Sequence, residues 1–291
     1  MKELKKFRKK NKKIVKEKVK PASKLINVIV ILVAIIFLSP IVICFLMAFK
    51  TPMETAENLF ALPESLNFEN FSKAIEVTNF FVSLKNSIIV TVGSVILIVF
   101  CSALSGYIIT RNRHKIFYRL VELTMLAGMM IPFQIVLIPI YRIMHNLGLL
   151  NTRIGAIILI CGCAVPYATF LYSGFVRTIP SELEEAAIID GCNMYQMYWR
   201  IIFPLLKPIT ATVAALEMLW TWNEFNVSLI VLQSKEVRTI PMQQFYFFGQ
   251  HVSNMNAAFA AATLSLIPVV VFFLMMQKYI AGGLTDGAVK G

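Results

Sequence analysis

The sequence predicts an all-α integral membrane protein with six transmembrane helices and one polar helix–Gly–helix loop on the cytoplasmic side. Of its 291 residues 57% are hydrophobic and 15% are charged, and its mean hydropathy is +0.70. Soluble domains usually carry about a quarter charged residues. Six apolar runs are each long enough to cross about 30 Å of hydrocarbon. These observations exclude an ordinary soluble domain.

The N-terminal segment 1–24 is strongly basic. It holds twelve Lys and Arg residues against Glu3 and Glu17, so most of the net charge of +12 is local. A basic segment directly before an apolar run is typical of a cytoplasmic anchor, and each charge near an anionic leaflet contributes about 1 kcal/mol. An RNA-binding arm is the alternative, but Phe7 is the only aromatic residue there that could stack on a base. We therefore expect membrane lipid, and no nucleic acid, as its partner.

The first span is predicted at residues 25–49, with Pro40 inside it. It lacks a small-residue cleavage site, which indicates an uncleaved helix and not a signal peptide. Residues 50–85 are polar and rich in Glu, so they form the first external segment, in which a short helix at 68–77 could lie on the membrane. A core of five further spans would then occupy residues 86–279.

The second span is predicted at 88–109 and the third at 121–143, where Pro132 and Pro139 interrupt it. Small residues in a membrane helix permit close helix packing. The second span carries five of them: Gly93, Ser94, Ser102, Ser105 and Gly106. Four basic residues follow it and indicate a return to the cytoplasm: Arg111, Arg113, Lys115 and Arg119.

An external turn at Gly148 and Asn151 leads to the fourth span, 154–176, with Pro166 inside it. The fifth span is predicted at 209–232, the segment 233–256 is external, and the sixth span covers 257–279. A short polar tail, 280–291, ends the chain.

The distribution of positive charge orients these spans. The segments assigned to the cytoplasm hold 21 Lys and Arg residues, against seven on the opposite side. Positive charge is retained in the cytoplasm, so both termini and the polar loop 178–208 are predicted there. We find no clear internal repeat, which weighs against carriers built from inverted repeats.

The loop 178–208 begins with a predicted capping box. Ser181 can accept a hydrogen bond from the backbone N–H of Glu184, and the Glu184 side chain can reach back to Ser181. Carboxylates also suit the positive end of a helix, and Glu182, Glu184 and Glu185 lie there. Gly191 favours a left-handed residue that ends the helix after about three turns.

A second short helix is predicted from residue 194 to 203. Asn193 and Gln196 repeat the capping pattern at its start, and Pro204 and Pro208 prevent it from continuing smoothly. An ordinary connection between membrane helices explains the same capping residues.

Within this loop, Glu185-Ala186-Ala187, Asp190-Gly191 and Ile202-Phe203-Pro204 resemble the EAA loop of bacterial ABC importer permeases, which are multi-pass proteins of the inner membrane. Phe203 stands where Leu is usual, so the position stays apolar. The resemblance implies a coupling helix that seats in a groove of a cytoplasmic ATPase. The small Ala side chains allow close approach and the carboxylates can meet basic groups. The coupling residues so implied are Glu185, Ala186, Ala187, Asp190, Gly191 and Pro204.

The sequence lacks the motifs of the enzymes that we considered. It has no GxxxxGK[ST] phosphate cradle, no HExxH and no Gly-x-Ser-x-Gly, and its three histidines are far apart. The five cysteines (Cys44, Cys101, Cys161, Cys163 and Cys192) suit small buried hydrophobes. We therefore expect no enzyme activity, no metal site and no cofactor on this chain. The resemblance places ATP and Mg on a partner ATPase.

Polar residues within the predicted fifth span are candidates for a substrate pathway, because ionisable groups are costly in a membrane. These are Glu217, Trp220, Trp222, Asn223 and Glu224. The same residues could instead pack at a subunit contact near the membrane edge. Residues 222–225 resemble the W-N-E-F segment of carbohydrate-importing members of the family, which implies a sugar substrate.

The C-terminus resembles the tail of the G-type permease of maltose-type importers. In that group the tail reaches into the ATPase dimer, whereas composition alone would indicate a disordered end. The implied contact residues are Gly283, Leu284, Thr285, Gly287, Val289, Lys290 and Gly291.

The resemblance as a whole implies a heterodimer with a second permease, two ATPase subunits and an external sugar-binding protein. A permease for polar amino acids or phosphate is an alternative that the tail disfavours. A secondary carrier would transport without an ATPase. A structural scaffold would leave the caps, Gly191 and the tail unexplained.

Overall fold

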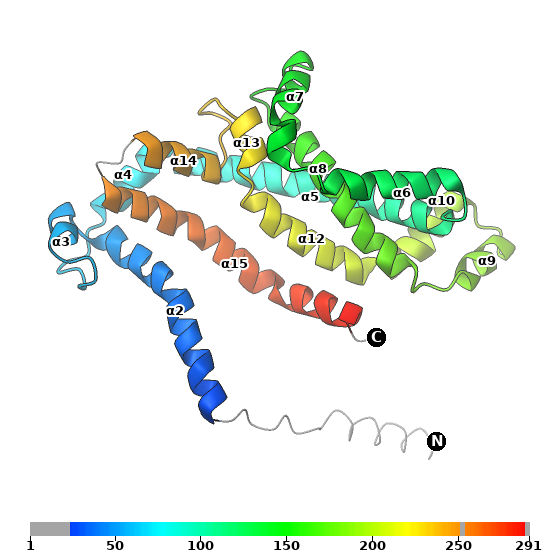
Figure 1. Cartoon of the computed structure of the whole chain (residues 1–291), viewed down its shortest axis with the longest axis horizontal. Helices are drawn as coiled ribbons and strands as arrows, with labels where there is room; N and C mark the ends of the chain where they lie inside the picture. Colours follow the sequence, from blue (N-terminus) through cyan, green and yellow to red (C-terminus); the bar gives the residue numbers. More distant parts are fainter. Residues whose placement is uncertain (1–23, 251–253, 289–291) are drawn as a thin grey trace.

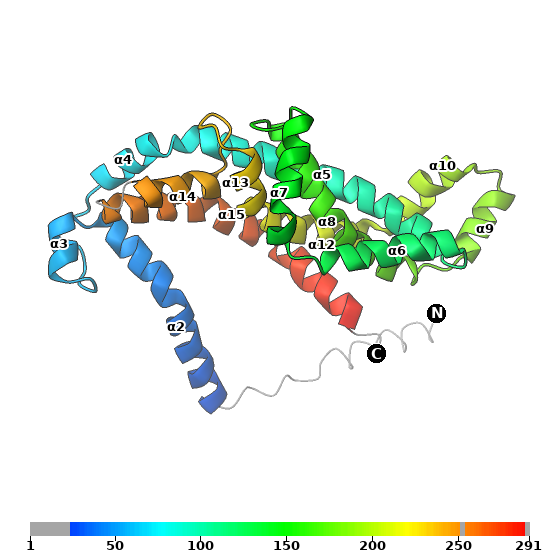
Figure 2. The same cartoon turned by 45° about the horizontal axis from the view of Figure 1, so that its top comes forward.

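The computed structural model describes residues 24–250 and 254–288, with only the backbone beyond Gln277. The predicted basic anchor therefore lies outside the described residues, apart from Lys24. The described chain consists of helices and loops without strands (Figures 1 and 2). In chain order the helical elements are α2 (Lys24–Phe49), α3 (Pro52–Glu57), α4 (Glu69–Val77), α5 (Phe80–Arg111), α6 (Ile116–Met129), α7 (Phe133–Asn146), α8 (Arg153–Val176), α9 (Glu182–Ile189), α10 (Met194–Met197), the π-helical turn η1 (Tyr198–Ile202), α11 (Phe203–Leu205), α12 (Lys207–Trp222), α13 (Asn226–Val231), α14 (Ile240–Gln250) and α15 (Met255–Ala288).

Four described helices are long and apolar enough to cross a membrane by themselves: α2, α5, α8 and the Met255–Met275 part of α15. Two bent pairs bring the number of candidate spans to as many as six. The pair α6 and α7 is bent by 106° at residues 130–132, and the pair formed by residues 194–205 and α12 is bent by 71°. The bent pair α6 and α7 corresponds to the predicted third span, whereas residues 194–205 of the second pair belong to the loop that is predicted in the cytoplasm.

The predicted fifth span is wrong as a continuous helix, because α12 stops at Trp222 and α13 begins only at Asn226. Polar side chains terminate both pieces. The Asn223 side-chain amide donates to the carbonyl of Leu219 at 2.8 Å. The Glu224 carboxylate accepts from the backbone N–H groups of Val227 and Ser228 at 2.9 and 3.2 Å. These bonds satisfy helix-end groups that would otherwise lack partners.

The core lies where α5, α8 and α12 pack together (Figure 1). Gly106 of α5 meets α8 so closely that an added Cβ would lie 2.6 Å from the Tyr172 Cβ. The Tyr172 side chain is fully buried, and its hydroxyl is hydrogen-bonded to Thr210 Oγ1 of α12 at 3.0 Å. The small residues of the second span therefore permit close packing, as predicted.

The segment 50–85 contains α3 and α4, and α4 confirms the predicted short helix at 68–77 to within one residue. This segment lies at the opposite end of the molecule from α9 and α10 (Figures 1 and 2). The Asn70 side chain secures it by donating to the carbonyls of Ala48 and Lys50. The helix α14, within 233–256, had no sequence signal that we recognised.

The N-terminal part of α2 stands apart from α5, α8 and α12 in both views, so none of the described residues covers its apolar surface (Figures 1 and 2). All five cysteines are free, but only Cys161 is buried. The prediction that all five are buried was wrong for the other four, which are partly exposed.

Candidate functional site

The helix–Gly–helix elbow consists of α9, Gly191 and α10. Gly191 has a φ of +82°, which confirms the predicted left-handed residue. Its N–H donates to the carbonyl of Ile188, and the N–H of Cys192 donates to the carbonyl of Ala187. This pair of bonds is a Schellman motif, which ends a helix and reverses the chain. α9 therefore has eight residues, about two turns, and not the three turns expected.

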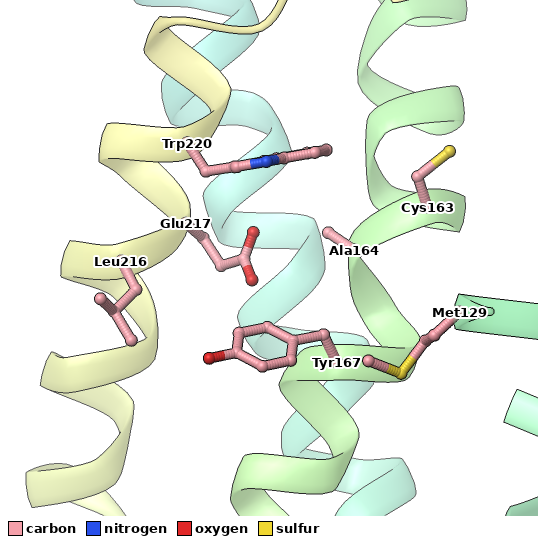
Figure 3. A pocket seen from close by; sticks show the side chains of 7 residues that line it. All are labelled: Met129, Cys163, Ala164, Tyr167, Leu216, Glu217 and Trp220. Atoms are coloured by element: carbon pink, nitrogen blue, oxygen red, sulfur yellow. The ribbon is translucent and has the colours of Figure 1, made fainter. Parts of the chain in front are cut away.

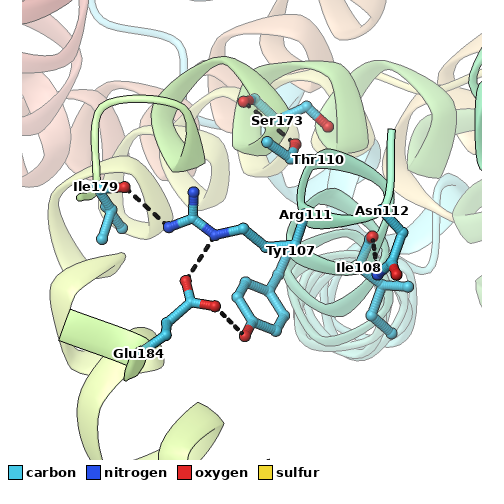
Figure 4. A network of polar contacts seen from close by, with 8 residues as sticks. All are labelled: Tyr107, Ile108, Thr110, Arg111, Asn112, Ser173, Ile179 and Glu184. Carbon is cyan, nitrogen blue, oxygen red and sulfur yellow. Dashed lines mark hydrogen bonds and ion pairs between the residues drawn. The ribbon is translucent and has the colours of Figure 1, made fainter. Parts of the chain in front are cut away.

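The predicted capping box at Ser181 is wrong. Ser181 has helical backbone angles, and its side chain caps no N–H group. The Glu184 carboxylate turns instead to α5, where it accepts from Arg111 Nε at 2.6 Å and from the Tyr107 hydroxyl at 2.9 Å (Figure 4). A charged guanidinium offers a stronger hydrogen bond than a neutral backbone N–H, which explains the difference.

The second capping pattern is confirmed. The Asn193 side chain accepts from the N–H of Gln196, and the Gln196 side chain accepts from the N–H of Asn193. The helix then passes through the π-helical turn into α11, where the exposed Pro204 lies, and the chain bends at Leu206. Leu206 is fully buried, which anchors this end of the elbow in the core.

The predicted coupling residues differ in their exposure. Glu185, Ala186 and Asp190 are exposed, whereas Ala187 packs into the core of this chain. The close approach that the Ala187 methyl permits is therefore to the chain's own helices.

The elbow also carries apolar side chains that sequence reasoning missed. Ile189 and Tyr195 are 85% and 82% exposed, and Ile188 and Met194 are exposed beside them. Their signal in the sequence was the presence of large apolar residues in an otherwise polar loop. Contiguous exposed apolar residues mark interaction surfaces.

A cavity of about 410 Å³ lies between α12, α8 and α6 (Figure 3). The Glu217 carboxylate lies between the rings of Trp220, one turn further along α12, and Tyr167 of α8. Glu217 is only 4% exposed, and no described residue donates a hydrogen bond to its carboxylate. The other lining residues are Met129, Cys163, Ala164 and Leu216. A buried carboxylate without a donor requires one from outside the described chain or a bound proton.

A second cavity, of about 440 Å³, adjoins the first, because both are lined by Met129, Cys163 and Trp220. It extends along α12 to Glu224 and the start of α13. Trp222 and Asn223 line neither cavity. Of the five predicted pathway residues, the fold thus brings together Glu217 and Trp220, places Glu224 in the adjoining cavity and leaves two apart.

Sequence comparison identifies the family of the chain. Residues 99–286 match the family described as the binding-protein-dependent transport system inner membrane component. The chain belongs to this family. It is therefore a multi-pass inner-membrane permease subunit, a transport component and not an enzyme.

Two curated relatives illustrate how far the similarity of this permease extends. It is 34% identical over 260 residues to the probable starch degradation products transport system permease protein of Thermoanaerobacterium thermosulfurigenes, covering 89% of this chain and 94% of the relative. It is 38% identical over 230 residues to the melibiose/raffinose/stachyose import permease of Bacillus subtilis, covering 79% and 83%.

A solved structure shares the fold of this permease along most of its length. A chain of a bacterial ABC transporter involved in the import of the acidic polysaccharide alginate superposes with a TM-score of 0.73 at 25% identity, covering 88% of this chain and 95% of the other. A second structure of a bacterial alginate ABC transporter, solved with an alginate-bound periplasmic protein, superposes with a TM-score of 0.65 at 18% identity and shows the fold alone.

The C-terminal tail is only partly described. The α15 backbone runs beyond the predicted end of the sixth span, to Ala288, so most of the segment 280–291 continues this helix. Only the backbone of Gly283, Leu284, Thr285 and Gly287 is described, and Val289, Lys290 and Gly291 lie wholly outside the described residues. The predicted contact of the tail stays a prediction.

The positive φ of Gly191 gives a direct test of the elbow. Gly191→Val should leave membrane insertion unchanged and lower substrate uptake about tenfold, because a left-handed residue with a Cβ costs roughly 1–2 kcal/mol and redirects α10. Gly174→Val is the matched control, since Gly174 lies in α8 with no atom near an added Cβ and no positive φ. Normal uptake by the Gly191 variant at normal expression would contradict the role of the elbow.

Proposed function

We propose that this permease is one half of the translocation pathway of an ATP-driven importer for di- or oligosaccharides or their derivatives. The observation that carries the proposal is its 34–38% identity, over most of the chain, to permeases named for starch degradation products and for melibiose, raffinose and stachyose. The cavity at Glu217 supports the same substrate class independently.

The cavity has the composition of a sugar site. Ligand pockets are usually about 300–1,000 Å³ and apolar, with few polar groups that fix orientation. The Glu217 carboxylate can accept hydrogen bonds from two sugar hydroxyls. Trp220 and Tyr167 offer aromatic faces on either side of it to the apolar C–H faces of a sugar ring. A bound sugar would provide the donors that Glu217 lacks within the described chain.

Glu224 has a different role in this proposal. Both of its carboxylate oxygens already accept backbone N–H groups of α13. It therefore shapes the adjoining cavity by fixing the break between α12 and α13. Trp222 and Asn223 act at the same break, or at a subunit contact, and not as sugar ligands.

The elbow is the proposed contact with the ATPase. Glu185, Ala186 and Asp190 are exposed beside an apolar surface formed by Ile188, Ile189, Met194 and Tyr195. Such a surface suits a groove with an apolar floor and basic groups at its rim. Gly191 and Pro204 set the direction of the two short helices, Ala187 anchors α9, and the tail 280–291 adds a second contact.

The assembly we propose contains a second permease, two ATPase subunits that bind ATP and Mg, and an external sugar-binding protein. Both termini face the cytoplasm, in line with the distribution of Lys and Arg. ATP binding closes the ATPase pair and moves the elbow, and the spans switch between inward-facing and outward-facing states. Coupling requires that the two states differ in their contacts with the ATPase.

Uptake by cells that lack this chain tests the substrate class. Labelled maltotriose, raffinose and melibiose are supplied separately, with labelled glutamine as the control solute. We expect that deletion abolishes uptake of at least one sugar, that the wild-type chain restores it, and that glutamine uptake does not change. Loss of glutamine uptake with all sugars unaffected would contradict the proposal.

Glu217→Ala should raise the KM of uptake, for the sugar whose uptake the wild-type chain restores, about 10-fold to 150-fold. The reason is that hydrogen bonds to a charged group contribute about 1.5–3 kcal/mol. Glu217→Gln should have a smaller effect, since its amide keeps one acceptor. Glu122→Gln is the control, because this α6 carboxylate lies outside the cavity at Glu217. An unchanged KM in the Glu217→Ala variant would place the sugar elsewhere.

A further inference from the structure

The structure assigns a transmitting role to a side-chain network that joins the elbow to a membrane helix. We propose that Tyr107, Arg111 and Glu184 form a tether through which movement of α9 reaches α5, and hence the helices around the Glu217 cavity. The inference rests on the proposed ATP-driven function for its readout of coupling, but the tether itself is a property of this chain.

Both oxygens of the Glu184 carboxylate accept hydrogen bonds in the tether (Figure 4). One oxygen accepts from Arg111 Nε at 2.6 Å and the other accepts from the Tyr107 hydroxyl at 2.9 Å. Arg111 also donates through Nη2 to the carbonyl of Ile179 at 2.8 Å. Arg111 therefore holds both α9 and the segment that leads into α9.

The tether is partly shielded from water. The side chains of Arg111 and Glu184 are 21% and 14% exposed. Exposed ion pairs contribute little because water and salt screen them. A shielded pair with charge-assisted bonds in two directions fixes geometry more firmly. Glu184 also provides the only side-chain hydrogen bonds from α9 to a membrane helix among the described residues.

The position of the tether explains what it can transmit. Arg111 is the last residue of α5, a helix of 32 residues. Five residues earlier, at Gly106, α5 packs directly against α8, whose Tyr172 is hydrogen-bonded to α12. α8 carries Tyr167 and α12 carries Glu217. A displacement of α9 is thus passed by close contacts to α8 and α12, two of the three helices that line the cavity.

A neighbouring ion-pair group provides a matched control. Glu122 of α6 bonds Arg113 and Arg177, and its side chain is 14% exposed, as is that of Glu184. Neither arginine lies on α9. Glu122→Gln and Glu184→Gln therefore remove equally shielded charges, but only the second breaks the link between the elbow and α5.

The test uses the full chain with Glu184→Gln, Tyr107→Phe and Glu122→Gln. The first measurement is hydrogen–deuterium exchange of the α9 backbone amides in lipid nanodiscs, which requires no sugar. We expect about tenfold faster exchange in Glu184→Gln, the equivalent of 1.4 kcal/mol. Tyr107→Phe should show a smaller increase, and Glu122→Gln none. Unchanged exchange in Glu184→Gln would overturn the tether, whatever the substrate is.

The second measurement is the number of ATP molecules hydrolysed per sugar imported by the assembled transporter. Glu184→Gln should raise this ratio about tenfold while the ATPase stays bound, and Glu122→Gln should not change it. The double variant Arg111→Glu with Glu184→Arg restores opposite charges, although not the bond to the Ile179 carbonyl. It should recover to within about threefold of wild type, because the effects of two changes in one ion pair are not additive.

The two measurements distinguish this inference from the proposed function. Faster α9 exchange with an unchanged ratio would overturn transmission through the tether. Failure of the wild-type chain to import any sugar would contradict the proposed function, whereas the exchange result would still decide whether Glu184 holds α9 on α5.

Discussion

Gly106→Val is expected to remove most of the folded permease from the membrane. An added Cβ would lie 2.6 Å from the Tyr172 Cβ, 3.1 Å from the backbone nitrogen of Ser173 and 3.2 Å from the carbonyl oxygen of Thr169. Two of these atoms are backbone, so no side-chain rotation relieves the clash. Overpacking typically costs about 1–3 kcal/mol and occasionally more, and the bond from Tyr172 to Thr210 extends the disturbance to α12.

The measurement is the amount and the Tm of monodisperse protein after extraction in mild detergent. Gly106→Ala should be less harmful than Gly106→Val, because it adds one carbon atom and not three. Gly162→Val, in α8, is the control, since no atom lies within 4 Å of its added Cβ. Wild-type yield and Tm for Gly106→Val would show that α5 and α8 do not pack in the membrane as described.

Glu185→Ala is expected to weaken binding of the ATPase about 10-fold to 150-fold, the equivalent of a charge-assisted contact worth about 1.5–3 kcal/mol. Glu185 is exposed and makes no hydrogen bond to another described side chain, in contrast to Glu184. A free carboxylate at the elbow is available to a basic group of a partner. Binding can be measured by titrating the purified ATPase onto the permease in nanodiscs.

The rival account is that Glu185 only stabilises α9 through the helix dipole, an effect of at most about 1 kcal/mol at an exposed site. Glu182→Gln removes a comparable charge from the same first turn, so the dipole account predicts equal losses from Glu182→Gln and Glu185→Gln. The docking account predicts the larger loss at Glu185. If Glu185→Gln and Glu185→Ala both leave ATPase binding and sugar uptake unchanged, the role given to this carboxylate is wrong.

The features that could be predicted from the sequence are those that depend on residues close to one another in the chain. The positive φ of Gly191 and the reciprocal cap of Asn193 and Gln196 depend on residues within one or two turns, and both are confirmed. Helix α8 and the first span depend on long apolar runs and match their predictions closely. For such features the determining interactions are present in the segment itself.

Predictions failed where a distant residue competes with a local one. Ser181 and Glu184 have the spacing of a capping box, but Arg111, 73 residues earlier in the chain, takes the carboxylate. No local pattern contains that partner. The fifth span failed for a related reason, because hydropathy averages over Asn223 and Glu224, whose side chains end one helix and begin the next.

The cavity could be predicted only in part. An acidic residue within an apolar run indicated Glu217, and the fold places it in a cavity with Trp220. Tyr167 and Cys163 carried no such signal, because residues of α8 look alike in sequence whether they face lipid, a neighbouring helix or a cavity. The packing of α8 against α5 and α12 decides which of them line the site.

The most direct test of the central claim is sugar uptake into proteoliposomes that contain this permease with the proposed second permease and ATPase. The sugar is the one whose uptake the chain restores in cells, and its binding protein is added outside. The account predicts uptake only when Mg-ATP is enclosed and the binding protein is present, and loss of uptake with Glu185→Ala. Uptake by this chain alone, driven by a proton or sodium gradient without ATP, would contradict it and show a secondary carrier.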